Sequence, residues 1–270
     1  MDPILSVAEE TGQSHEELAR HWAELFVIHD RLVLQTFERW LGKERAPELH
    51  RRVWENPTAS LLEIFQSVGP TAADALAAYA RAFMIHDYWF LRVLRDELGD
   101  VDAAEAHHSL WEGQAEDFAL VHEQDRPGEQ DTLSWEQLYR LYKEHCDREG
   151  LPYRFVEATD DKLVVEAHQC AYFDTISKEV GEEEAKEHNH LIAIDSTDRT
   201  IEAFFVGIGR PNEFRGVMTR HRCHGDSVCQ IEFTRRDPDE PEKLGEPLER
   251  PGARCYWLRN AVLQARGPEA

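Results

Sequence analysis

The residues best suited to chemistry gather around one predicted β-hairpin. Its turn is Cys223-His-Gly-Asp-Ser-Val-Cys229, so two thiols lie on neighbouring strands. Cys170 ends an earlier predicted strand and directly precedes a predicted helix, whose amide dipoles stabilise a thiolate. Thiols and imidazoles are the ligands that zinc takes in tetrahedral sites. One interpretation of the sequence is therefore a zinc site whose candidate ligands are Cys170, Cys223, Cys229, His168 and His224.

The same cysteines could instead supply a nucleophile, because a neighbouring histidine or a helix start lowers the pKa of a thiol. The candidate catalytic groups are the thiols of Cys170 and Cys229, the acids Asp195 and Asp226, and the orienting imidazoles of His221 and His224. Structural alternatives stay open. Cysteine is often a small buried hydrophobic residue, five residues between two cysteines is not a standard zinc spacing, and Asp195 could simply cap the next helix.

The first half of the chain contains a tandem repeat. When residues 23–55 are shifted by 57 positions, thirteen of the 33 residues match without a gap. FVIHD at Phe26–Asp30 recurs as FMIHD at Phe83–Asp87. A repeat of this length predicts two copies of one helical unit, each of which buries the apolar face of the other.

The repeated His-Asp pairs are a second candidate site. His29, Asp30, His86 and Asp87 stand in the middle of predicted helices and could bind metal where the copies meet, as in two-metal carboxylate bundles. Those bundles need Glu-x-x-His on two helices, and the first copy has Arg51 where that histidine belongs. The alternative is that the histidines pack in the bundle and hydrogen-bond to neighbouring acids, or line a ligand cavity.

Composition narrows the class of partner. The net charge of −23 repels phosphate backbones and anionic membrane surfaces, so we expect neither nucleic acid nor membrane as a partner. No apolar run approaches the length of a spanning helix, and no signal peptide is visible, which favours the cytoplasm. Five cysteines in a chain of 270 residues do not form a disulfide framework.

The pattern of capping residues, glycines and alternation predicts an α+β fold. Helices are expected over 16–41, 45–55, 60–68, 71–98, 102–122 and 135–149, followed by a hairpin over 153–168, a helix over 171–186, a strand over 191–194, a helix over 198–206 and a hairpin over 217–234. The predicted divisions are a helical repeat domain over 1–125, a linker over 126–133, an α+β domain with a small antiparallel sheet over 134–236, and a polar tail over 237–270.

The second half resembles the L-2-amino-thiazoline-4-carboxylic acid hydrolase family. The resemblance lies in Leu163-Val-Val-Glu-Ala-His-Gln-Cys170-Ala-Tyr172, Ile194-Asp195, Pro211-x-x-Phe214 and His224-Gly225-Asp226-x-x-Cys229-x-x-x-Phe233. The closing segment is also similar to vinyl-reductase-type sensor domains, which can bind zinc through cysteines. The chain departs from the hydrolase pattern at Ala171 in place of proline, at Ile194 in place of cysteine and at His221 in place of threonine.

The resemblance implies hydrolytic opening of a cyclic amidine-like ring in a small sulfur-containing amino acid, with Cys170, Asp195, Asp226 and Cys229 at the motif positions. Our leading hypothesis is therefore a small-molecule hydrolase whose pocket lies between the helical repeat and the cysteine hairpin. The alternatives are a non-catalytic sensor that binds a small molecule, with zinc held by cysteines, and a ferritin-like oxidase. The sequence predicts no oligomeric state.

Overall fold

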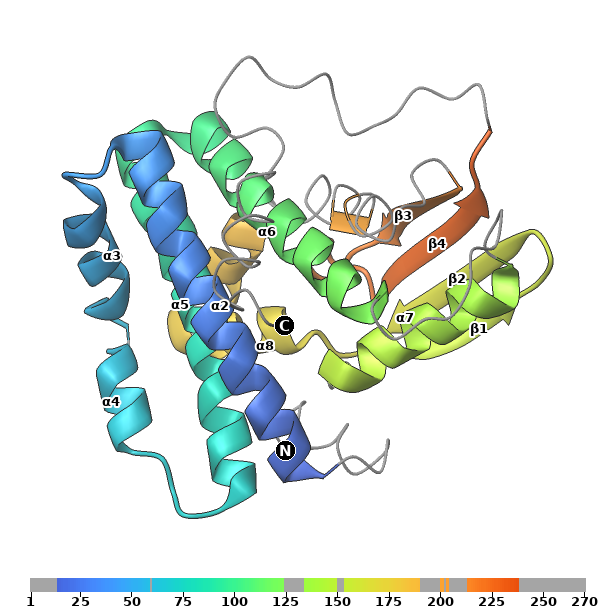
Figure 1. Cartoon of the computed structure of the whole chain (residues 1–270), viewed down its shortest axis with the longest axis horizontal. Coiled ribbons are helices and arrows are strands. Elements are labelled where there is room, and N and C mark those ends of the chain that lie inside the picture. The colour runs from blue at the N-terminus through green and yellow to red at the C-terminus, as the bar shows by residue number, and fades with distance from the viewer. Residues whose placement is uncertain are drawn as a thin grey trace.

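The structure, a computed structural model, describes residues 14–58, 60–123, 134–149, 153–189, 200–201, 203 and 213–237. It confirms the predicted α+β fold, in which a helical N-terminal region precedes a small antiparallel sheet (Figure 1). The helices are α2 (His15–Leu41), α3 (Ala46–Trp54), α4 (Leu61–Gln66), α5 (Ala72–Leu98), α6 (Asp100–Glu123), α7 (Trp135–Glu149) and α8 (Ala171–Val180). The strands are β1 (Arg154–Ala158), β2 (Lys162–Ala167), β3 (Phe214–Arg220) and β4 (Cys229–Arg235), with a 3-10 turn, η1 (Arg222–His224).

The sequence repeat is also a structural repeat. Helices α2 and α5 both have 27 residues, and each begins with a capping box, one built on Ser14 and the other on Thr71. Each ends at a glycine with positive φ, 90° at Gly42 and 77° at Gly99, where a residue with a side chain would be strained. These start and stop signals lie 57 positions apart, so the two copies fold to the same length and present equivalent residues at equivalent heights.

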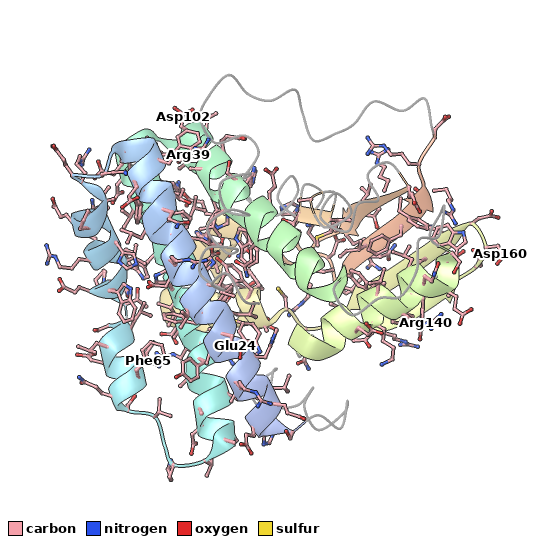
Figure 2. All side chains as sticks on the ribbon, in the orientation of Figure 1. Glu24, Arg39, Phe65, Asp102, Arg140 and Asp160 are labelled. Carbon is pink, nitrogen blue, oxygen red and sulfur yellow. The ribbon has the colours of Figure 1, made fainter. Side chains whose placement is uncertain are left out.

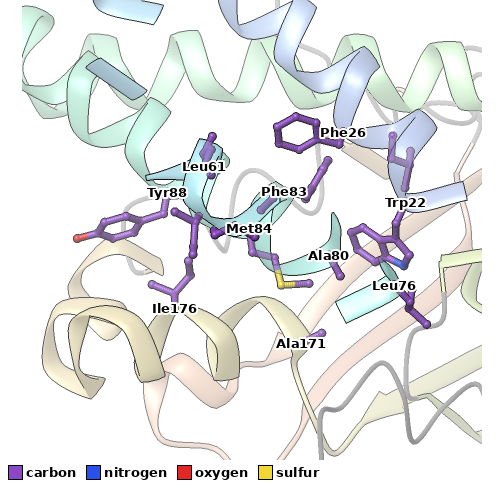
Figure 3. Close-up of a cluster of buried hydrophobic side chains, with 14 of the residues drawn as sticks. Trp22, Phe26, Leu61, Leu76, Ala80, Phe83, Met84, Tyr88, Ala171 and Ile176 are labelled. Atoms are coloured by element: carbon purple, nitrogen blue, oxygen red, sulfur yellow. The ribbon is translucent and has the colours of Figure 1, made fainter. Parts of the chain in front are cut away.

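Two core clusters hold the bundle together, and one of them extends into the second half of the chain. Figure 3 shows Ala171 and Ile176 of α8 beside Ala80 and Met84 of α5. Phe65 of α4 closes the other side of the same cluster against Phe26 (Figure 2). Because α8 buries its apolar face in the bundle core, the residues at its start are fixed relative to the repeated helices.

The sheet has the strand order β1-β2-β4-β3, and each neighbouring pair is antiparallel. Helix α7 covers one face, where Leu138 and Leu141 pack against Leu163 and Phe233. Both predicted hairpins are present, and the connection of the second contains η1. The charged side chains of Arg140 and Asp160 lie on the outer side of this region (Figure 2).

The predicted continuous helix over 171–186 is wrong. Helix α8 ends at Val180, and Gly181 has a φ of 96°, after which a separate helical segment covers 182–189. A left-handed glycine ends the hydrogen-bond ladder and redirects the chain. The predicted strand over 191–194, Asp195 and most of the helix predicted over 198–206 lie outside the described residues, as does nearly all of the predicted tail. In the described part of the chain no helix is long and apolar enough to cross a membrane.

Candidate functional site

The sheet brings two of the predicted cysteines together. In the β2–β4 pair, Ala167 lies opposite Cys229, and three residues after Ala167 the chain reaches Cys170 at the N-cap of α8. Both thiols therefore stand at the same end of this strand pair. The Cys170 side chain forms a hydrogen bond with that of Cys229, and the Phe173 amide donates to the Cys170 sulfur at 3.4 Å.

The two thiols have opposite electrostatic properties. The hydrogen bond from Cys170, with the Arg222 amide 3.4 Å from the sulfur and the Arg222 charge nearby, outweighs burial and lowers the pKa of Cys229 to about 7. The pKa of the Cys170 thiol is raised well above its ordinary value by the same hydrogen bond and by burial. Cys170 is therefore the thiol that keeps its proton longer, and Cys229 is the member of the pair that ionises first.

An ion pair that the sequence analysis missed supports this thiol pair. The Arg222 guanidinium donates to both carboxylate oxygens of Asp174 at 2.9 Å, and Asp174 also accepts the Cys170 amide at 3.1 Å. This arrangement ties the hairpin turn to the first turn of α8. No pattern in the sequence marks either partner, because the two residues are 48 positions apart and each is a common surface residue.

The other predicted residues of the hairpin lie around its turn. Cys223 is buried, and burial together with the charge of Cys229 raises its pKa to about 11. The rings of His221 and His224 lie 4.7 Å apart. Asp226 is exposed and accepts the His221 amide at 2.8 Å, so its carboxylate closes the turn. Within the described ranges Asp174, rather than Asp226, is the acid in contact with the thiol pair.

The predicted zinc ligands do not form a compact set. His168 points to solvent, with its side chain 55% exposed and 3.5 Å from Glu166. Among the described residues, the one group of three or more candidate ligand atoms lying within 4.8 Å of one another is Asp30, His50 and His86 in the bundle. Zinc at the hairpin stays a prediction that this geometry does not favour.

An open depression of about 610 Å³ adjoins the hairpin. It is lined by η1 and the helical segment over 182–189, through Glu183, Glu184, Lys186, Glu187, Cys223 and His224. Glu184 is in turn held by Tyr88 and Arg92 of α5, at 2.9 and 2.7 Å. The depression thus lies beside the bundle, but the repeated helices do not line it.

The bundle centre contains the repeated His-Asp pairs in a crossed arrangement. Asp30 accepts hydrogen bonds from His50 and Trp54 of its own copy, both at 2.7 Å, and lies 3.0 Å from His86 of the other copy. Burial acts to raise the pKa of Asp30, but its close contacts with His50 and His86 hold it well below its ordinary value. Burial lowers the pKa of His86 to about 4.

Asp87 has the equivalent neighbours in the second copy. His107 lies 3.0 Å from its carboxylate and Trp111 3.3 Å, while His29 of the first copy lies 3.3 Å away. Here a fourth donor is added, because the Tyr172 hydroxyl of α8 donates to Asp87 at 2.7 Å. Burial would raise the pKa of Asp87, but the His107 and His29 contacts keep it well below its ordinary value.

The four residues proposed as an alternative metal site are therefore brought together, but as two exchanged pairs. Asp30 meets His86 and Asp87 meets His29, and the two imidazole rings lie 5.4 Å apart between the pairs. The sequence does mark the additional partners, because His50 and Trp54 of the first copy recur as His107 and Trp111 of the second. No such signal marks Tyr172.

No family model, no curated protein and no solved structure matches this chain.

Proposed function

We propose that the protein is a small-molecule hydrolase in which the Cys229 thiolate attacks an electrophilic C=N or C=O carbon of a small amino-acid-like substrate. The observation that carries the proposal is the placement of the two thiols: Cys170 at the N-cap of α8 and Cys229 at the start of β4 stand at the same end of the β2–β4 pair, and the Arg222 amide lies 3.4 Å from the Cys229 sulfur. A nucleophile whose pKa lies near neutrality combines a large thiolate fraction with good reactivity. Both cysteines keep part of their accessible surface.

Each residue has a separate role in the proposed reaction. Cys229 forms a bond to the substrate carbon, and the nitrogen or oxygen of the opened double bond takes a proton from the Cys170 thiol. For a cyclic amidine, the bond from this carbon to the protonated ring nitrogen then breaks, the exocyclic amino group passes a proton to the leaving amine, and the carbon stays bound to Cys229 as an imidothioester. Water adds to that carbon and gives one proton to the imine nitrogen. The carbon–sulfur bond to Cys229 then breaks as the carbonyl forms, and the second water proton restores Cys170. Arg222, fixed by Asp174, stabilises the negative charge on Cys229 before attack and after release.

The thiol pair also supports a cytoplasmic location for this activity. Cys170 and Cys229 are free thiols in hydrogen-bond contact, and neighbouring thiols persist in a reducing compartment. In an oxidising compartment a contact of this kind favours a disulfide, which would consume the nucleophile. The strongly acidic surface, with a net charge of −23, is likewise compatible with a protein that works without nucleic acid or membrane partners.

The first test is the pH profile of alkylation by iodoacetamide, with each cysteine followed by peptide mass spectrometry. We expect the rate at Cys229 to rise to half its plateau near pH 7, and that at Cys223 to stay low until pH approaches 11. In Cys170→Ser, the thiol beside Cys229 is replaced by a hydroxyl, and the alkylation profile of Cys229 should shift toward alkaline pH. A Cys229 profile centred near the ordinary thiol value, unchanged by Cys170→Ser, contradicts the proposed nucleophile.

The second test is turnover. The purified protein is incubated with 2-aminothiazoline-4-carboxylate, and the ring-opened product is detected by the added mass of one water. Product should form with the wild-type protein and be absent with Cys229→Ser, while Cys146→Ser, which alters a buried cysteine of α7, should leave the rate unchanged. If the Cys229 thiolate is reactive but no product forms, the sensor alternative is favoured, and binding of the same compound by calorimetry distinguishes it.

A further inference from the structure

The two Asp–His–Trp clusters of the bundle differ in access. The Asp30 side chain is 25% exposed and that of His50 is 20% exposed. The Asp87 and His107 side chains are each 1% exposed, and the Tyr172 hydroxyl occupies the Asp87 carboxylate from the side of α8. The duplicated sequence thus builds one cluster that is open to solvent and one that is sealed.

The open cluster has three ligand atoms in one place. The Nε2 atoms of His50 and His86 lie 2.7 and 3.0 Å from Asp30 Oδ1, and the three groups offer atoms that all lie within 4.8 Å of one another. They come from three helices, α3, α5 and α2, so the site is fixed by the bundle and not by one flexible segment. Two imidazoles and one carboxylate form a ligand set typical of zinc and iron(II) centres that keep an open position.

His86 gives independent support. Its ring is fully buried, yet neither ring nitrogen has a hydrogen-bond partner of good geometry, and the 3.0 Å contact of Nε2 with Asp30 is misaligned for a hydrogen bond. Leaving a buried polar atom unsatisfied costs roughly 1–3 kcal/mol. A cation between His86 and Asp30 would satisfy Nε2 through its lone pair and remove this cost.

Trp54 completes the arrangement. Its indole N–H donates to the Asp30 carboxylate at 2.7 Å and so fixes the orientation of the carboxylate. A hydrogen bond from outside the ligand set is the usual support for a carboxylate that binds a metal. A tetrahedral zinc ion with bonds of about 2.0–2.1 Å needs ligand atoms roughly 3.4 Å apart. The distance from His50 Nε2 to Asp30 Oδ1 must therefore widen from 2.7 Å to roughly 3.4 Å, and α3, which carries His50, is a short helix of nine residues at the edge of the bundle.

We propose that Asp30, His50 and His86 bind one divalent transition-metal ion per chain, and that the second copy of the repeat does not, because Tyr172 closes it. The site is distinct from the thiol pair and is independent of the proposed hydrolase. It also differs from the zinc site predicted at the cysteine hairpin. Substitution of His50 should abolish metal binding if the bundle holds the ion, and substitution of the cysteines should abolish it if the hairpin does.

The test uses the full chain, stripped of metal with a chelator and titrated with Zn²⁺ by calorimetry and with Co²⁺ by absorption. We expect one equivalent of each, and a Co²⁺ spectrum without the sulfur charge-transfer bands of cysteine ligation. His50→Gln keeps a polar group beside Asp30 but removes the imidazole, and affinity should fall by more than about 100-fold, beyond the 10–100-fold typical of supporting residues. Trp54→Phe should weaken binding by roughly 10-fold.

Matched controls come from the second copy and from the hairpin. His107→Gln, the equivalent of His50, and the double variant Cys170→Ser/Cys229→Ser should both keep full Zn²⁺ affinity. Circular dichroism checks that every variant is folded. Asp30→Asn removes a second ligand, and its amide oxygen can still accept the hydrogen bond from Trp54. Absence of stoichiometric binding by the wild-type protein overturns the proposal, as does unchanged affinity in folded His50→Gln and Asp30→Asn, or loss of binding in the cysteine double variant.

Discussion

The Asp30 and Asp87 clusters contain the same kinds of donor in the same order along the chain, yet only one of them has become part of the protein interior. Asp30 lies at the edge where the short helix α3 ends, and water reaches its carboxylate. Asp87 lies beneath α8 and receives a fourth donor from Tyr172. The repeat therefore determines which residues form each cluster, whereas the solvent exposure of a cluster depends on which other helix packs against that copy.

Removal of each carboxylate should give the largest contrast. Asp87→Ala leaves His107, Trp111 and Tyr172 without their acceptor in a buried setting, and loss of one member of such a buried group costs about 3–5 kcal/mol. Asp30→Ala should cost about 1 kcal/mol, because water can replace the carboxylate at this partly exposed edge. Urea unfolding measures both, and equal losses would show that exposure does not distinguish the two copies.

Acid should destabilise the protein through two buried histidines, His86 at the open cluster, whose pKa burial lowers to about 4, and His188 on the sealed side. His188 is fully buried beside Tyr172, and burial lowers its pKa from 6.5 to about 3, against the opposing pull of Asp87. Below pH 6.5 the unfolded chain therefore binds a proton that the folded chain refuses. Stability present above pH 6.5 is lost as the pH falls toward 3, at up to about 1.4 kcal/mol per pH unit, or about 2 kcal/mol by pH 5.

The variant His188→Gln isolates this contribution, because glutamine does not titrate. Its unfolding free energy should fall less than that of the wild-type protein between pH 7 and pH 5. The groups facing His188 include His107, Arg92 and Arg95, and the positive charges of the two arginines also lower the pKa of His188. Parallel pH dependences of variant and wild type would place the acid sensitivity elsewhere in the molecule.

Tyr172→Phe opens the sealed cluster without removing packing. The variant loses the hydrogen bond to the charged Asp87, worth about 1.5 kcal/mol, and leaves His188 Nε2 without its contact at 3.1 Å. Tyr88→Phe is the matched control, since its hydroxyl donates to Glu184 at 2.9 Å near the surface. We expect chemical denaturation to show a smaller loss for Tyr88→Phe; the reverse order would mean that Tyr172 does not seal the cluster.

The smallest effects should be equal in the two copies. Ser14→Ala and Thr71→Ala each remove a capping box at the start of a 27-residue helix, at a cost of about 1 kcal/mol. Both caps are exposed and far from the carboxylates, so thermal unfolding should give similar losses. A large difference between them would mean that the asymmetry of the copies extends along the whole helix pair.

Local signals in the sequence predicted the helical half well. Ser14, Thr71, Gly42 and Gly99 mark helix ends through interactions within a few residues, and these ends were correctly located. Equivalence between the copies also implied that the His-Asp pairs would meet at their interface. The exchange of partners between copies was not predicted, because it depends on how α2 and α5 face each other.

Long-range pairs were beyond sequence reasoning. Asp174 and Arg222 meet only because the β2–β4 register brings the start of α8 beside the hairpin turn. Tyr172 reaches Asp87 across 85 positions because α8 buries its apolar face against α5 in the bundle core. The break at Gly181 was accessible to local reasoning, since a glycine ends α2, α5 and α8 alike, but the strong helix formers that follow it, Glu182 to Glu187, hid it.

The exchange of histidines also constrains how such a protein could be divided. Asp30 of the first copy contacts His86 of the second, and Asp87 of the second copy contacts His29 of the first. Residues 14–69 alone would therefore leave His29 without Asp87 and Asp30 without His86. A chain with one repeat unit could make the same contacts only by association with an identical molecule about a true two-fold axis. Covalent duplication turns that dimer interface into the interior of one chain. The two copies can then differ, so that α8 covers the Asp87 cluster and leaves the Asp30 cluster uncovered.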